Sequence, residues 1–229
     1  MERKVCLSFG GSVFSKKDGF NTGYIHGMAN LIKSYKDTKF IIVVGGGYAS
    51  REYIGNASKV IENNFVLDQI GIMFTKMNAM LLRNFLSRYI NGVYYDHIND
   101  INNLQDVLTE NRVVVFGGMT PGITTDSVAV LACEATGCKR MINISREAYI
   151  YDRNPNEKGA KRLERLGYDT LIARASKDDQ RNAGSNFVFD IVACKLAKRS
   201  KTEISFVDDD IENLRAAIDG KRHRGSLVK

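Results

Sequence analysis

The stretch FIIVVGGGYASR, residues 40–51, decides the fold, because an uninterrupted apolar run ends in three glycines and an arginine follows them. The run 40–44 predicts a buried strand, since a strand covered on both faces is apolar throughout. The glycines predict a turn into a helix over 48–61. The start of a helix offers free N–H groups that suit an anion. Arg51, one turn into that helix, either binds phosphate through paired hydrogen bonds or lies solvated on the helix surface.

Two further apolar runs end in the same way. Residues 5–9 precede Gly10-Gly11-Ser12, and residues 113–116 precede the loop GGMTPGITTD, which ends at Asp126. Each motif alone is weak, because a GGS is often an ordinary turn and Asp126 can simply cap the helix that follows. All three together predict glycine-rich loops at one edge of a parallel sheet, which is where ligands bind in such folds.

The rest of the chain alternates strands and helices, which indicates an α/β fold with a mostly parallel central sheet covered by helices on both faces. The 229 residues suit a single domain, residues 1–229. We expect further strands at 92–96, 140–144 and 204–207, helices at 24–35, 68–88, 103–109, 127–134 and 211–218, and a loop followed by a helix within 183–200. In the long helix the apolar spacing predicts a buried side of Ile72, Met73, Met77, Met80, Leu81, Phe85 and Leu86.

Composition narrows the functional classes. Lys and Arg outnumber Asp and Glu by 33 to 26, a net charge of +7, but the charges are spread along the chain and no basic run is interleaved with aromatics. This favours attraction of phosphorylated metabolites over nucleic-acid binding. No CxxC occurs among the four cysteines, and with three histidines no zinc-site spacing is present. We expect no membrane segment, because the longest apolar runs look too short to span a bilayer.

Several motifs in one order resemble the archaeal type of UMP kinase, in the amino-acid-kinase family. The resemblance runs over about residues 4–228 and is far more specific than any single motif. It is carried by GGS at 10–12, VVGGGYASREYI at 43–54, LDQIGI at 67–72, NAMLL at 78–82, VVVFGGMTPGITTDSVAVLACEATG at 113–137 and AGSNFVFD at 183–190, with Ala193, Lys195 and AKRS at 197–200 behind it.

The resemblance implies a three-layer αβα sandwich of eight strands that transfers a phosphoryl group from ATP, with Mg²⁺, to UMP. It also implies a cytoplasmic homohexamer built as a trimer of dimers, with no nucleic-acid or membrane partner. Residues from 1 to about 135 would form the acceptor lobe for UMP, and residues from about 136 to 229 the donor lobe for ATP. Such chemistry needs positioning and neutralisation of charge rather than a nucleophilic side chain.

The resemblance also implies the site residues. The residues at the transferred phosphoryl would be Gly10, Gly11, Ser12 and Arg51. The UMP site would comprise Gly46, Asp68, Met119, Thr120, Pro121, Gly122, Ile123, Thr124 and Thr125, with Asp68 accepting from ribose hydroxyls. The ATP site would comprise Ser8, Gly10, Gly11, Ser12, Gly47, Arg51, Ser145, Arg146, Tyr151 and Asn154. No protein side chain is assigned to the metal.

Two departures from the family pattern affect the donor side. Ser8 stands where much of the fold carries a lysine, and Lys16, Lys195 or Arg51 could replace that cation or could be ordinary surface charges. The family reads approximately TNVDGVY before an Asp-Pro, whereas this chain reads SREAYIYDRNP over residues 145–155. A tyrosine at 149 in place of glycine matters if the loop requires a positive φ. Arg146 could add a phosphate contact or alter the donor preference.

Two other functions remain open from the sequence. One is another small-molecule kinase of the same fold, for carbamate, acetylglutamate or isopentenyl phosphate. Tyr48 stands where the isopentenyl phosphate enzymes carry histidine, and Asp68 with TPGITTD favours a nucleotide acceptor. The other is a nucleotide-binding protein with weak or lost catalysis, which the altered segment 145–154 suggests.

Overall fold

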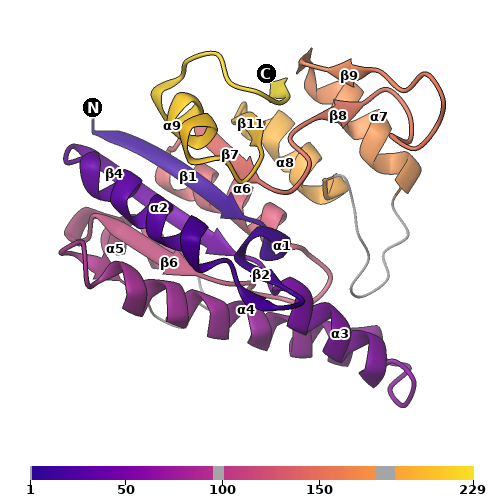
Figure 1. Cartoon of the computed structure of the whole chain (residues 1–229), viewed down its shortest axis with the longest axis horizontal. Helices are drawn as coiled ribbons and strands as arrows, with labels where there is room; N and C mark the ends of the chain where they lie inside the picture. Colours follow the sequence, from indigo (N-terminus) through magenta and orange to yellow (C-terminus); the bar gives the residue numbers. More distant parts are fainter. Residues whose placement is uncertain (1, 95–100, 179–188) are drawn as a thin grey trace.

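The computed structural model describes residues 2–94, 101–178 and 189–229 (Figure 1). Its centre is an eight-stranded sheet in the order β10-β12-β11-β7-β1-β4-β6-β5. All neighbouring strands run parallel except β11 and β12, which pair antiparallel. The sheet strands are β1 Arg3–Phe9, β4 Thr38–Val44, β5 Val93–Tyr94, β6 Val113–Phe116, β7 Arg140–Ile144, β10 Arg165–Leu166, β11 Glu203–Val207 and β12 Leu227–Val228. This confirms the expected α/β class.

Helices form a layer on each side of the sheet (Figure 1). Alternation along β1 divides the core, because Val5, Leu7 and Phe9 face one layer and Cys6 faces the other. The first layer holds α2 Thr22–Ser34, α4 Asn64–Leu86 and α9 Ile211–Asp219, and the second holds α5 Leu104–Glu110, α6 Thr125–Thr136, α7 Tyr168–Asp178 and α8 Ile191–Ser200. The αβα sandwich therefore has two apolar cores.

The short elements lie at the ends of the sheet strands or beyond the sheet. They are α1 Gly11–Phe14, the hairpin of β2 Ser15–Lys16 and β3 Gly19–Phe20, α3 Gly47–Ala57, the 3₁₀ turn η1 Ile101–Asn103, and the hairpin of β8 Ile150–Tyr151 and β9 Arg162–Leu163. Both hairpins, β10 and β12 are absent from the sequence-based expectation, because two-residue strands carry almost no periodic signal. Helix α7 is absent from it as well, although it is long enough to show helical spacing. The expected residues 95–96 and 183–188 lie outside the described residues.

Helix α4 corrects the predicted burial. Met73, Met77 and Met80 are 65%, 50% and 48% exposed, and Leu81 is exposed as well, whereas we expected all four to be buried. Leu86 is buried as expected, and Phe85 packs partly against the core. The buried face instead comprises Leu67, Thr75, Asn78, Ala79, Leu82 and Leu86. Both sets have helical spacing, so periodicity alone cannot choose between two apolar faces of one helix.

The length of α4 bears on the expectation about membranes. By length and composition, it is the one helix among the described residues that could cross a bilayer. Its buried face, however, packs against the sheet through Ala79 and Leu82, and its polar side chains Thr75 and Asn78 are engaged in the loops described below. The packing explains the apolar character of this helix, because α4 is part of one helical layer of the sandwich.

Candidate phosphate-binding site

The first two glycine loops touch each other at the carboxyl edge of the sheet. The amide of Gly45 donates to Phe9 O at 2.9 Å, and a Cβ added at Gly45 would lie 2.6 Å from the nitrogen of Gly11. A Cβ added at Gly11 would overlap the backbone of Gly47, which itself has a positive φ of 79°. Real side chains cannot occupy such positions. Close approach of the two backbones therefore requires these glycines.

Helix α4 joins the second loop to the third. The amide of Asn78 donates to Gly45 O at 2.9 Å and Gly46 O at 3.0 Å, while Thr75 Oγ1 accepts from the amide of Gly118 at 2.7 Å. Gly117 packs against Thr75 so closely that a Cβ would lie 2.5 Å from its hydroxyl oxygen. Sequence reasoning missed both polar side chains, although each interrupts the apolar pattern of α4.

A cavity of about 190 Å³ opens between the second and third loops. Seven of its lining residues are among those expected from the sequence: Gly46, Gly47, Arg51, Asp68, Ile123, Thr124 and Thr125. The others are Ser50, Ile54, Gly71, Ile72, Thr75 and Gly118. The carboxylate of Asp68 accepts from the amide of Gly122 at 2.8 Å, so it anchors the third loop. Met119, Thr120, Pro121 and Gly122 belong to that loop without lining the cavity.

Two aspartates, Asp126 and Asp190, lie behind the loops and accept hydrogen bonds there. From the sequence we assigned neither of them a catalytic role. Asp126 lies in the first turn of α6 and is not its cap, contrary to our expectation. Its Oδ1 accepts from the Ser8 hydroxyl at 2.7 Å and from the Asn143 amide at 2.8 Å. Asp190 Oδ2 accepts from the hydroxyls of Thr124 and Ser127. The sequence did contain a signal for this cluster, because Ser8 and Asn143, the partners of Asp126, each interrupt a largely apolar strand.

Burial, with a smaller contribution from the charge of Asp190, raises the pKa of Asp126 from its usual 3.8 to about 6, although the hydrogen bonds from Ser8 and Asn143 act to lower it. The side chain sits where water is scarce, and two carboxylates repel each other. Perturbed acidic groups beside a cavity are candidates for functional residues. The position where the wider fold carries lysine is thus a buried hydroxyl bound to a carboxylate.

Arg51 and Arg146 supply positive charge on the two sides of the first loop. Burial, and then the charge of Arg146, lower the pKa of Arg51. In the described part of the chain, neither guanidinium has an ion pair or hydrogen bond to a carboxylate. Of the other cations that the sequence offered as replacements, Lys16 instead pairs with Asp209 at 3.8 Å.

The remaining donor-side residues lie on or beside the β8–β9 hairpin. Ser145 Oγ donates to Glu147 O, Tyr151 accepts from Arg162 at 3.2 Å, and Asn154 accepts from the amide of Asn156. Tyr149 does not have the positive φ that a glycine there would suggest, and Arg162 stacks on its ring at 4.6 Å. The structure thus places Ser145 beside Gly10, while Tyr151 and Asn154 make their contacts within the hairpin region.

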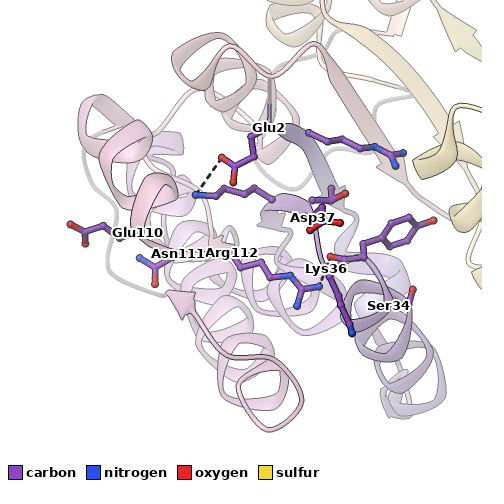
Figure 2. Close-up of a pocket in the computed structure, with 11 residues that line it drawn as sticks. Glu2, Ser34, Lys36, Asp37, Glu110, Asn111 and Arg112 are labelled. Atoms are coloured by element: carbon purple, nitrogen blue, oxygen red, sulfur yellow. Dashed lines mark hydrogen bonds and ion pairs between the residues drawn. The ribbon is translucent and has the colours of Figure 1, made fainter.

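A larger cavity of about 830 Å³ lies at the opposite edge of the sheet, where β1 and β4 begin (Figure 2). Two of its cations, Lys39 and Arg112, bind carbonyls at the ends of helices. Arg112 donates to Ile32 O at 2.7 Å, and Lys39 donates to Thr109 O at 2.7 Å and pairs with Glu2. These contacts satisfy the last carbonyls of α2 and α5, so the cavity has a structural explanation.

Fold and site together define an α/β protein with three glycine-rich loops at one edge of its parallel sheet. The family model of the amino acid kinase family matches residues 3–208. The chain belongs to the amino acid kinase family.

The most similar relatives found are all archaeal. The chain is 36% identical over 222 residues to the uridylate kinase of Thermoplasma volcanium, covering 96% of this chain and 95% of that protein. It is 35% identical over 229 residues to the uridylate kinase of Thermoplasma acidophilum, covering 100% and 97%. The crystal structure of the uridylate kinase from Archaeoglobus fulgidus superposes with a TM-score of 0.83 at 31% identity, covering 98% of this chain and 99% of that one.

Proposed function

We propose that this protein is a UMP kinase, which transfers the γ-phosphoryl group of ATP to UMP in pyrimidine nucleotide biosynthesis. The observation that carries the proposal is the contact between glycine loops at the ends of β1 and β4, beside a cavity lined by Arg51 and Asp68. The relatives named above are uridylate kinases over nearly their whole length, which supports the same substrates here.

The acceptor would occupy the cavity between the second and third loops. Gly46, Ile123, Thr124 and Thr125 line it, and the loop Met119–Gly122 would close over the nucleotide. Asp68 holds the amide of Gly122 with one oxygen, which leaves its other oxygen to accept from a ribose hydroxyl. Arg51 would hold the UMP phosphate at the side nearest the first loop.

The donor would approach from the other side of the first loop. Gly10, Gly11 and Ser12 would line the transferred phosphoryl group, and Ser8, Gly47, Ser145 and Arg146 would surround the phosphate chain. Tyr151 and Asn154 would lie toward the nucleoside. An oxygen of the UMP phosphate forms a new bond to the γ-phosphorus of ATP. The bond between the γ-phosphorus and the bridging oxygen of the β-phosphate breaks, and ADP leaves with the electron pair of the broken bond. No covalent intermediate is needed.

Mg²⁺ would enter with ATP. Among residues 2–94, 101–178 and 189–229 no group of three or more His, Cys, Asp or Glu side chains could hold a metal ion. This fits Mg²⁺ in phosphoryl transfer, which is held by one or two carboxylates together with substrate phosphates. Asp126 and Asp190, which lie behind the loops, are the carboxylates that would serve, and the metal would neutralise charge on the phosphates.

The lobes and the assembly complete the proposal. Residues up to about 135 would bind the acceptor and the remainder the donor. The exposed methionines of α4, with Phe65 and Tyr53 exposed nearby, form an apolar surface that suits a second copy of the chain. We propose that this contact forms the dimer of a cytoplasmic homohexamer, a trimer of dimers.

A coupled assay of ADP release tests the function. UMP should support turnover with Mg²⁺ and ATP, whereas carbamate, acetylglutamate and isopentenyl phosphate should not. Arg51→Ala should lower kcat/KM about ten- to a thousandfold, as loss of one preorganised donor does. UMP binding without turnover would refute the kinase assignment, and turnover of another acceptor would refute the substrate.

A further inference from the structure

The bend between α4 and β5 contains the one Asn-Gly step in the sequence, Asn91-Gly92. Both residues are exposed. Gly92 has a φ of 70°, a conformation that residues with a side chain rarely adopt, so the fold favours glycine at this position. An asparagine that precedes glycine cyclises readily, because no Cβ hinders the approach of the next backbone nitrogen to the side-chain amide.

Neither of the two groups that would react is held by the fold. Within residues 2–94, 101–178 and 189–229, the side chain of Asn91 makes no hydrogen bond, and the backbone nitrogen of Gly92 donates to no acceptor. The fold holds only the carbonyl of Gly92, which accepts from the amides of Arg112 at 2.9 Å and Val113 at 3.1 Å. The nitrogen of Gly92 is therefore available to the side chain that precedes it.

The pair Asp219-Gly220 at the end of α9 has the opposite arrangement. The carboxylate of Asp219 accepts from the hydroxyl of Tyr35 at 2.7 Å, and the amide of Gly220 donates to Ala217 O at 3.1 Å. A nitrogen whose N–H is already bonded can attack only after the backbone opens locally. The two pairs thus differ in their hydrogen bonds as well as in the acid and the amide.

We propose that Asn91-Gly92 is a site of spontaneous deamidation. The nitrogen of Gly92 attacks the side-chain carbonyl carbon of Asn91 and loses its proton, the bond from that carbon to the amide nitrogen breaks, and ammonia leaves. A five-membered succinimide results. Water then breaks one of the two ring bonds to nitrogen: loss of the bond to the side-chain carbonyl gives aspartate, and loss of the bond to the main-chain carbonyl gives isoaspartate. Water is the only co-reactant, and the inference is independent of the proposed function.

The two products affect the following strand differently. Each replaces a neutral amide by a carboxylate, which lowers the net charge of +7 by one. Isoaspartate also inserts one methylene into the main chain directly before β5. The pairing of β5 with β6 begins there, with Val93 opposite Val113. Since β5 is the last strand of the sheet, the disturbance should stay at this edge.

Incubation of the full chain at mildly alkaline pH, followed by tandem mass spectrometry of the tryptic peptide 89–112, tests the proposal. Residue 91 should gain about 1 Da, because OH replaces NH₂. An isoaspartyl-specific methyltransferase with a labelled methyl donor should label the aged chain at the same residue. Asn91→Gln should keep its amide, because attack would then have to close a less favourable six-membered ring.

Asp219→Asn is the matched control, because it creates a second Asn-Gly step at which the glycine amide is bonded to Ala217 O. Position 219 of that variant should deamidate about tenfold more slowly than Asn91, or slower still, because the bonded backbone must open first. Equal rates at the two positions overturn the proposal. So does an Asn91 that keeps its amide in the folded chain while the urea-unfolded chain loses it.

Discussion

The acceptor side and the donor side of the site are built in different ways. Where the first two glycine loops meet beside the proposed acceptor cavity, backbone touches backbone at Gly11, Gly45 and Gly47, and buried side chains of α4 hold the loops. On the proposed donor side, within residues 145–163, the exposed side chain of Arg162 contacts Tyr149 and Tyr151. Buried backbone contacts tolerate almost no change, whereas exposed side chains can be exchanged. The departures from the family pattern accordingly fall on the donor side.

The largest effect should follow from breaking the backbone contact between the first two glycine loops. Gly11→Ala places a Cβ 2.6 Å from the Cα of Gly47, which must shift. We expect a loss of roughly 3 kcal/mol or more in unfolding free energy, at the upper end for single substitutions. Gly23→Ala is the control, because its added Cβ meets nothing within 4 Å. Urea unfolding measures both, and equal stabilities would contradict the contact.

A second large effect should follow from Asp126→Asn, in opposite directions for activity and stability. Activity should fall at least about a hundredfold if the carboxylate acts on the phosphoryl or its metal. Stability at pH 8 should rise by roughly 1–2 kcal/mol, because the partly buried carboxylate no longer has to be charged, and residual water reduces the gain.

The sign of this stability change follows from the pKa of Asp126, which folding raises from 3.8 to about 6. The protonated carboxyl stabilises the fold below pH 3.8, and this contribution is lost as the pH rises through 6. The advantage of Asp126→Asn should therefore open between these values and stay constant above them. Thermal unfolding at several pH values measures it, and a pH-independent difference would contradict the raised pKa.

A smaller effect should separate binding from chemistry on the acceptor side. Asp68→Asn removes the charge that holds the amide of Gly122 and would hold the ribose. We expect KM for UMP to rise about tenfold, from one lost charge-assisted hydrogen bond, with kcat and KM for ATP nearly unchanged. A fall in kcat alone would place Asp68 nearer the transferred group than we propose.

The smallest effect on the fold should come from the outer face of α4. Met77→Lys adds a charge at a side chain that is 50% exposed, so the unfolding free energy of the single chain should change by about 0.5 kcal/mol or less. The assembly should dissociate, which light scattering would detect. Met28→Lys, at a fully buried side chain, is the contrasting variant that should unfold the chain. An unchanged mass for Met77→Lys would contradict the proposed dimer contact.

Local sequence was sufficient to place the main strands and the glycine loops. The runs at 40–44 and 113–116 are apolar throughout and the run at 140–144 is largely apolar, and each lies in a strand of the sheet. It was not sufficient for the outer face of α4 or for Asp126, which looked like a cap. Both depend on which distant elements pack beside them, and periodicity within one segment does not contain that information.

The sequence by itself determined that three strands end in glycine and that these ends gather at one edge, because parallel strands must align their carboxyl ends. Only the tertiary structure decided which polar side chains meet there. Ser8 and Asp126 are far apart in the chain, yet their oxygens lie 2.7 Å apart. Such pairs depend on the register of β1 against its neighbours and on the packing of α6, and these are set by the whole core at once.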